Sequence, residues 1–264
     1  MNSATQAWDW LRRELDHWAE DGLQADFWWR DDDATDRGAK LDRLMQLSED
    51  HSAPIALAII PAQLQSGLSD RLREFPLASV LQHGYDHQSH ARPGQRKLEL
   101  GGDRQPEDVL QDLQTGYDIL NRAFDSRLVP VMVPPWNRID PGVVARLAET
   151  GFTGLSTMRV RRQAHPAPGL LQVNTHLDPV AWRQQRGFIG TYPAIAILVQ
   201  HLVARRTGYR DIDEPTGILS HHLAQTDPVW QFLDRLLAFL QQHPAARFVD
   251  AASIWPAQAP SAKR

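Results

Sequence analysis

Short apolar runs alternate with amphipathic stretches along most of the chain. The run from Pro54 to Ile60 contains no polar residue, which is typical of a strand buried on both faces. By the same reasoning we expect strands at 25–31, 54–60, 77–82, 128–133, 152–157, 170–173, 217–220 and 247–249. Apolar residues at helical spacing predict helices at 4–20, from 35 or 36 to 47, and at 69–74, 103–124, 140–150, 191–206 and 227–242.

This alternation of strands and helices predicts an α/β fold, with a parallel sheet covered by helices and either open or closed into a barrel. No linker or internal repeat interrupts the pattern. We therefore expect one domain at 1–255, which includes the N-terminal helix, and a disordered tail at 256–264. Several polar residues directly follow predicted strands, and ligands bind at that edge in both barrels and open α/β sheets.

The stretch Phe27–Asp33 is the most distinctive of these strand ends, because an aromatic run leads directly into three aspartates. Three adjacent carboxylates repel one another, which costs stability unless a cation or hydrogen-bond donors neutralise them. Aspartates are also common in turns and at helix N-termini, so an acidic turn is the simpler interpretation of this stretch taken alone.

Composition narrows the chemistry that is available. The chain has no cysteine, which excludes disulfides and thiolate metal sites, so any metal must be held by histidines and carboxylates. The net charge of −4 offers no basic field for nucleic acid. No run reaches the length of a membrane span, and residues 1–20 lack the apolar core of a signal peptide, so we expect a cytoplasmic protein. The oligomeric state stays open.

His83 and His87 follow the predicted strand at 77–82 and lie four residues apart. On a helical turn, two such imidazoles face the same way and can share one metal. With eleven histidines in the chain such a pair also arises by chance, but its place after a strand favours a metal site. Two imidazoles and one carboxylate leave coordination positions open, which suits Zn²⁺ or another divalent transition metal in hydrolysis.

The order of these pieces along residues 25–250 resembles the polysaccharide deacetylases (NodB-homology domain, carbohydrate esterase family 4). Asp-Asp follows the first strand, His-x-x-x-His the third, Pro-Pro-Trp a later one, and Leu-Ser-His a late one. The resemblance implies a distorted (β/α) barrel in a single domain. It also implies removal of an acetyl group from an N-acetylated sugar or glycoconjugate with a divalent metal, Zn²⁺ first and Co²⁺, Ni²⁺ or Mn²⁺ as alternatives.

The resemblance assigns roles to the first two motifs. Asp31 is expected to be the general base and Asp32 a metal ligand, although a register one residue later would use Asp32 and Asp33 instead. In the first register Asp33 caps the following loop. His83 and His87 are expected to be the other two ligands, with Gly84 where the family has a serine or threonine.

The third motif departs from the family pattern, because Val133 stands where an arginine orients the base. Arg30 or Arg138 is a candidate substitute, although strand alternation would aim Arg30 away from a base at Asp31. Pro135 and Trp136 are expected to wall the groove for the acetyl group.

The last two motifs concern the general acid. The resemblance makes His221 the acid that protonates the leaving amine, and Asp178 the residue that tunes it. His222 follows directly, so a strand would point it to the opposite face.

We therefore expect a metal-dependent deacetylase. Two other readings remain open, a carbohydrate-binding pseudoenzyme on the same fold and a metal-dependent hydrolase of another amide or an ester.

Overall fold

The computed structural model describes residues 3–183 and 186–256. The strands in chain order are β1 (Ala25–Ala34), β2 (Ile55–Ile59), β3 (Ala78–His83), β4 (Leu128–Val133), β5 (Gly154–Leu155), β6 (Leu171–Gln172), β7 (Val180–Ala181), β8 (Gly187–Phe188), β9 (Thr216–Ser220) and β10 (Ala246–Phe248). The α-helices are α1 (Ala4–Glu20), α2 (Ala39–Asp50), α3 (Ser66–Leu72), α4 (Pro106–Phe124), α5 (Pro141–Val144), α6 (Thr191–Arg206), α7 (Asp227–Gln241) and α8 (Ala251–Ile254).

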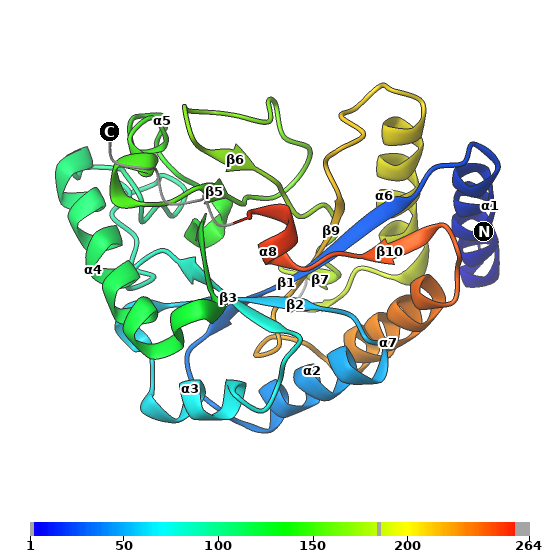
Figure 1. The fold of residues 1–264 in the computed structure, drawn as a ribbon, viewed down its shortest axis with the longest axis horizontal. Helices are drawn as coiled ribbons and strands as arrows, with labels where there is room; N and C mark the ends of the chain where they lie inside the picture. Colours follow the sequence, from blue (N-terminus) through cyan, green and yellow to red (C-terminus); the bar gives the residue numbers. More distant parts are fainter. Residues whose placement is uncertain (1–2, 184–185, 257–264) are drawn as a thin grey trace, which may run out of the picture.

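The main sheet is parallel and curves into a half-barrel, with helices around its outside (Figure 1). β1 is its longest strand and crosses the middle of the molecule. It pairs with β10 and then β2 along one edge and with β9 along the other, and the sheet continues from β2 through β3, β4 and β5 to β6. This architecture confirms the predicted α/β class and the single domain with a distorted barrel.

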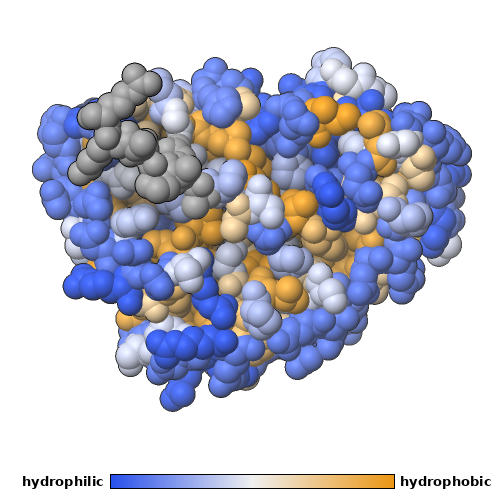
Figure 2. Space-filling view, in the orientation of Figure 1, coloured by the Kyte–Doolittle hydropathy of each residue, from blue (hydrophilic) through white to orange (hydrophobic). Residues whose placement is uncertain are grey.

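The two faces of β1 pack against different parts of the molecule. Phe27 and Trp29 pack with the outer helices, whereas Trp28 packs inside the half-barrel with small and branched residues of the neighbouring strands. Because side chains alternate along a strand, Arg30 and Asp32 share the inner face with Trp28, and Asp31 shares the helix-facing side. In Figure 2, polar residues of the outer helices surround a more apolar centre on the face that is shown.

Most predicted elements are present, with differences at their ends. The first strand runs on to Ala34, so the three aspartates lie within its last residues rather than after it. The predicted helix at 140–150 is a single α-turn, α5, followed by a 3-10 turn at Leu147–Thr150. The short antiparallel pair of β7 and β8 and the helix α8 were not predicted. Of the predicted tail, residues 257–264 lie outside the described residues.

Within the described ranges, every helix is too short or too polar to cross a membrane.

Candidate metal and catalytic site

The end of β1 departs from regular strand pairing just where the aspartates lie. Asp31 pairs with Leu57 and Ala34 with Ile59, so β1 has one residue more than β2 between these two pairs. Asp33 has a φ of 70°, a left-handed conformation that is uncommon outside glycine. This bulge breaks the alternation of side chains, and as a result Asp32 and Asp33 both face the interior of the half-barrel.

Two histidines face Asp33 from the end of β3. His83 is the last residue of that strand and is buried, and its Nδ1–H donates to the carbonyl oxygen of Val133 at 3.0 Å. This bond fixes the proton on Nδ1 of a neutral ring and leaves the Nε2 lone pair free. His87 follows in an irregular loop with a φ of 62°, so the two rings do not meet through the helical turn that the spacing suggested.

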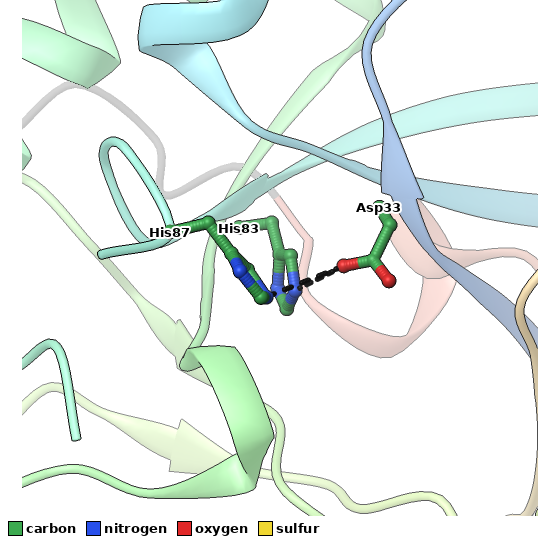
Figure 3. Close-up of side chains that lie close together, drawn as sticks. All are labelled: Asp33, His83 and His87. Atoms are coloured by element: carbon green, nitrogen blue, oxygen red, sulfur yellow. Dashed lines mark ion pairs between the residues drawn. The ribbon is translucent and has the colours of Figure 1, made fainter. Parts of the chain in front are cut away.

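The three side chains converge on one point (Figure 3). The Nε2 atoms of His83 and His87 lie 3.2 and 3.4 Å from the same oxygen, Oδ1 of Asp33. Ligand atoms about 2.0–2.1 Å from a tetrahedral metal lie about 3.3 Å apart from one another. The spacing and the donor types of these residues, with the free Nε2 lone pair of His83, therefore fit a divalent metal ion.

The charges within this group affect one another strongly. Burial would raise the pKa of the Asp33 carboxyl, but a protonated His83, through its Nε2–H and its charge, and the charges of His221 and His87 hold that pKa below its usual value. Burial would lower the pKa of His83, yet the charges of Asp32 and Asp33 raise it overall. The pKa of His87 is lowered by burial and by the charge of His83.

Asp32 lies beside this group but is bound by Arg30. The guanidinium makes a fork to the carboxylate, with Nε 2.8 Å from Oδ1 and Nη2 3.0 Å from Oδ2. Both side chains are buried, and Arg30 is further fixed by Ser156 and Asn137. The arginine missing at position 133 thus has a counterpart two residues before Asp32 on the same strand. Arg138 lies elsewhere, where it donates to the carbonyl oxygen of Lys97.

Asp31 points the other way and is not brought to the histidine pair. One of its oxygens accepts hydrogen bonds from the Ser220 hydroxyl at 2.6 Å and the His222 backbone N–H at 2.9 Å. The other lies 2.5 Å from Nδ1 of His222. Asp31, the predicted general base, therefore links β1 to the end of β9 on the helix-facing side, away from the histidine pair.

His221 faces the site from the opposite side, as the alternation along β9 requires. Its Nε2 lies 4.0 Å from Oδ2 of Asp32, and its Nδ1 lies 3.7 Å from Oδ2 of Asp178. Asp178 also accepts hydrogen bonds from the Trp182 indole and the backbone N–H of Val180. Trp182 packs edge-on against His221 with ring centroids 4.6 Å apart. Trp182 is not among the site residues that the sequence predicts.

Trp136 lies beside His87, and the neighbouring Pro135 is buried next to Gly84. The Trp136 ring lies 4.6 Å from that of His87, and Trp136 has a φ of 55°. The structure therefore brings the predicted residues Arg30, Asp32, His83, His87, Trp136, Asp178 and His221 to one site, adds Asp33, and places Asp31 outside it.

A second group of possible metal ligands lies between α6 and β9. His176, His201 and Glu214 are all buried, with the His176 Nε2 3.7 Å from a Glu214 oxygen. However, Nδ1 of His176 accepts the backbone N–H of Gly217 at 2.9 Å, so Nε2 carries the proton of the neutral ring. A metal here would displace that proton or break that bond, whereas His83 has the opposite and favourable tautomer.

This second pair of histidines predicts a pH-dependent stability. Burial lowers the pKa of His176 to about 3, and burial with the charge of His176 lowers that of His201. Because both pKa values are lower in the folded protein, the unfolded chain takes up protons first as the pH falls below about 6.5. Each ring therefore lowers the free energy of unfolding by up to about 1.4 kcal/mol between pH 7.5 and pH 5.5. In urea unfolding, His201→Gln should lose about 1.4 kcal/mol less over this range than the wild type. An equal loss in His201→Gln and the wild type would contradict the assignment.

Comparisons with solved structures identify the fold. The chain superposes on a protein from Mycobacterium smegmatis assigned as a polysaccharide deacetylase, with a TM-score of 0.63, 15% identity, and coverage of 88% of this chain and 89% of the other. A family 4 acetyl xylan esterase from Clostridium thermocellum in complex with a cobalt ion gives a TM-score of 0.54, 12% identity, and coverage of 87% and 89%. Searches against protein-family models and curated proteins gave no match.

The fold is thus that of the polysaccharide deacetylases, over 88% of the chain and at low identity. A carbohydrate esterase family 4 pseudoenzyme from Bacillus anthracis also shares it, with a TM-score of 0.55, 12% identity, and coverage of 88% of this chain and 66% of the other. Because the fold carries both enzymes and a pseudoenzyme, activity has to be argued from the residues of the site.

Proposed function

We propose that this chain is a metal-dependent deacetylase that acts on an N-acetylated sugar or glycoconjugate. The observation that carries the proposal is the pair of carboxylates at the β1 bulge. Asp33 faces His83 and His87, whereas Asp32 stands free of that group and near His221. One carboxylate is therefore available to a metal and its neighbour to proton transfer, which is the division that amide hydrolysis needs.

Asp33, His83 and His87 would hold the metal, with Zn²⁺ as the first choice and Co²⁺, Ni²⁺ or Mn²⁺ as alternatives. When bound, such an ion would polarise the acetyl carbonyl and lower the pKa of a nearby water. This assignment takes the register in which Asp33 replaces Asp32 as the ligand. The cobalt ion in the structurally similar acetyl xylan esterase supports a divalent metal in this fold.

Asp32 and His221 would then transfer the protons. Asp32, held in place by the Arg30 fork, takes the proton of the attacking water. His221 lies across the site and gives a proton to the leaving amine, while the charge of Asp178, 3.7 Å from its Nδ1, would stabilise the protonated ring. An amine must be protonated before it can leave, so an acid opposite the base is required for amide cleavage.

The walls of the site support a carbohydrate as substrate. Trp136 and the half-exposed Trp182 stand on opposite sides, next to His87 and His221. Aromatic rings offer apolar faces to a sugar ring and to an acetyl methyl group. A structurally similar peptidoglycan N-acetylglucosamine deacetylase has a TM-score of 0.54, 15% identity, and coverage of 90% of this chain and 95% of the other.

The test is acetate release from N-acetylglucosamine oligomers by protein freed of metal and reloaded. Turnover is expected with Zn²⁺ or Co²⁺ and should fall to background after chelation, because loss of the metal removes both carbonyl polarisation and water activation. An O-acetylated xylan oligomer serves as the matched ester substrate. Turnover of the ester alone would make the protein an esterase. Metal and glycan binding with no turnover of either would make it a carbohydrate-binding pseudoenzyme and contradict the proposal.

A further inference from the structure

Glu99 lies under the loop that carries His87. Its carboxylate accepts three consecutive backbone N–H groups, those of Tyr85 at 2.6 Å, Asp86 at 3.2 Å and His87 at 3.1 Å. The side chain is 1% exposed, and in the described part of the chain no arginine or lysine pairs with it. A buried carboxylate without a cation is costly, so these three N–H groups are its compensation.

Gly84 is matched to this carboxylate. It has a φ of 57°, and a Cβ at this position would lie 2.5 Å from Oε2 of Glu99 and 2.7 Å from the ring of Pro135. A serine or threonine at position 84 could not coexist with Glu99 in this conformation. The carboxylate therefore occupies the space beside the first histidine where a hydroxyl side chain would otherwise lie.

Glu99 is itself anchored to the opposite wall. Its neighbour Leu100 is buried and forms a parallel bridge with Ile139, and the Leu100 carbonyl accepts the backbone N–H of Asp140 at 2.8 Å. These residues follow the turn that carries Trp136. The carboxylate thus ties the His87 loop to the framework that also positions the aromatic wall.

We infer that Glu99 is a positioning residue of the metal site, an inference that rests on the proposed function. His87 is held at a φ of 62°, a left-handed conformation that is costly for a non-glycine residue and needs support from its surroundings. The hydrogen bonds that the backbone N–H groups of residues 85–87 donate to Glu99 supply that support. They hold the Nε2 of His87 at 3.4 Å from the Asp33 oxygen, where one ion can contact both.

The experiment compares Glu99→Gln with Glu214→Gln. Glu214 is an equally buried glutamate, 1% exposed, and it also accepts backbone N–H groups, but it lies in the other histidine group. Zn²⁺ affinity is measured by competition with a chromogenic chelator, and the visible spectrum of the Co²⁺-loaded protein reports the ligand geometry. Groups that orient metal ligands typically contribute 10–100-fold to metal affinity, so Glu99→Gln should weaken Zn²⁺ binding by about that factor and change the Co²⁺ spectrum. Glu214→Gln should leave both unchanged.

Glu99→Asp keeps the charge but shortens the side chain by one methylene, so its Zn²⁺ affinity should lie between those of the wild type and Glu99→Gln. It also serves as the test if Glu99→Gln does not fold. Wild-type affinity in Glu99→Gln, or equal losses in the Glu99 and Glu214 variants, would overturn the inference. If the wild type itself bound no metal, the proposed function would fail instead, and the two failures are therefore distinguishable.

Discussion

Asp33→Ala is expected to abolish tight metal binding while the protein stays folded. Asp33 supplies the only carboxylate oxygen within 3.4 Å of both imidazole Nε2 atoms in the described structure, so its loss leaves two neutral ligands. Removing a group that merely orients a ligand costs 10–100-fold, and removing a charged ligand should cost more, above about 100-fold in Zn²⁺ affinity. Metal content after dialysis and a competition titration measure the effect.

Asp32→Asn is the matched control for this experiment. It changes the neighbouring carboxylate, which is bound by Arg30 rather than directed at the histidines, so its Zn²⁺ affinity should stay within a few-fold of the wild type. The reverse result, in which Asp32→Asn loses the metal and Asp33→Ala retains it, would restore the ligand set of Asp32, His83 and His87 expected from the sequence.

Much of the fold could be predicted because its signals are local. The apolar run after Pro54 and the wholly apolar β4 could hardly be other than buried strands, and α6 begins and ends at the predicted residues. The predicted elements that turned out shorter than expected depend on other contacts. β5 and β6 have two residues each, and α5 has four, so their identity depends on contacts with neighbours rather than on periodicity.

The register of the aspartates could not be predicted, because it depends on a bulge. In a regular strand Asp31 and Asp33 would share a face, and Arg30 would lie opposite to a base at Asp31. The extra residue before Ala34 brings Asp33 to the side of Asp32, and a base at Asp32 then shares its face with Arg30. Nothing in the triplet itself marks where β2 stops matching β1. The missing arginine at Val133 was the one available clue, since it required a substitute within reach of the base.

The position of His87 also depends on residues distant in sequence. The spacing of four residues correctly predicted that His83 and His87 lie close together, but it did not predict the local structure. The two histidines are not on a helical turn, because the loop that carries His87 is shaped by Glu99 and by the turn at Pro135. A buried acid twelve residues further along the chain leaves no pattern that periodicity can detect. Asp178, which lies near His221, could be named only through the resemblance to the deacetylase family, because no periodicity or strand end marks it.

Asp32→Asn and Asp31→Asn should have very different kcat values. If Asp32 takes the proton of the attacking water, Asp32→Asn should lower kcat by about 10²–10⁴-fold with the metal still bound. Asp31→Asn should instead weaken the link to Ser220 and His222 and cost about 1–3 kcal/mol of stability, while the folded fraction keeps most of its kcat. Rates measured on metal-loaded protein, with urea unfolding of both variants, provide the comparison. A greater loss of kcat in Asp31→Asn would make Asp31 the base.

Arg30→Lys extends this test from the base to the residue that orients it. Lysine keeps the positive charge but lacks the planar fork, so it can reach only one oxygen of Asp32 at a time and loses the bonds to Ser156 and Asn137. If the fork sets the direction of the Asp32 carboxylate, kcat should fall by about 10–100-fold at unchanged Zn²⁺ affinity, since the effect on the reaction is one of geometry. In the double variant with Asp32→Asn, the Arg30 substitution should add almost nothing, because a positioning residue has no effect once the group it positions is gone. Additive losses would mean that Arg30 acts on the substrate or on the fold independently, and the absence of an arginine at Val133 would then need another explanation.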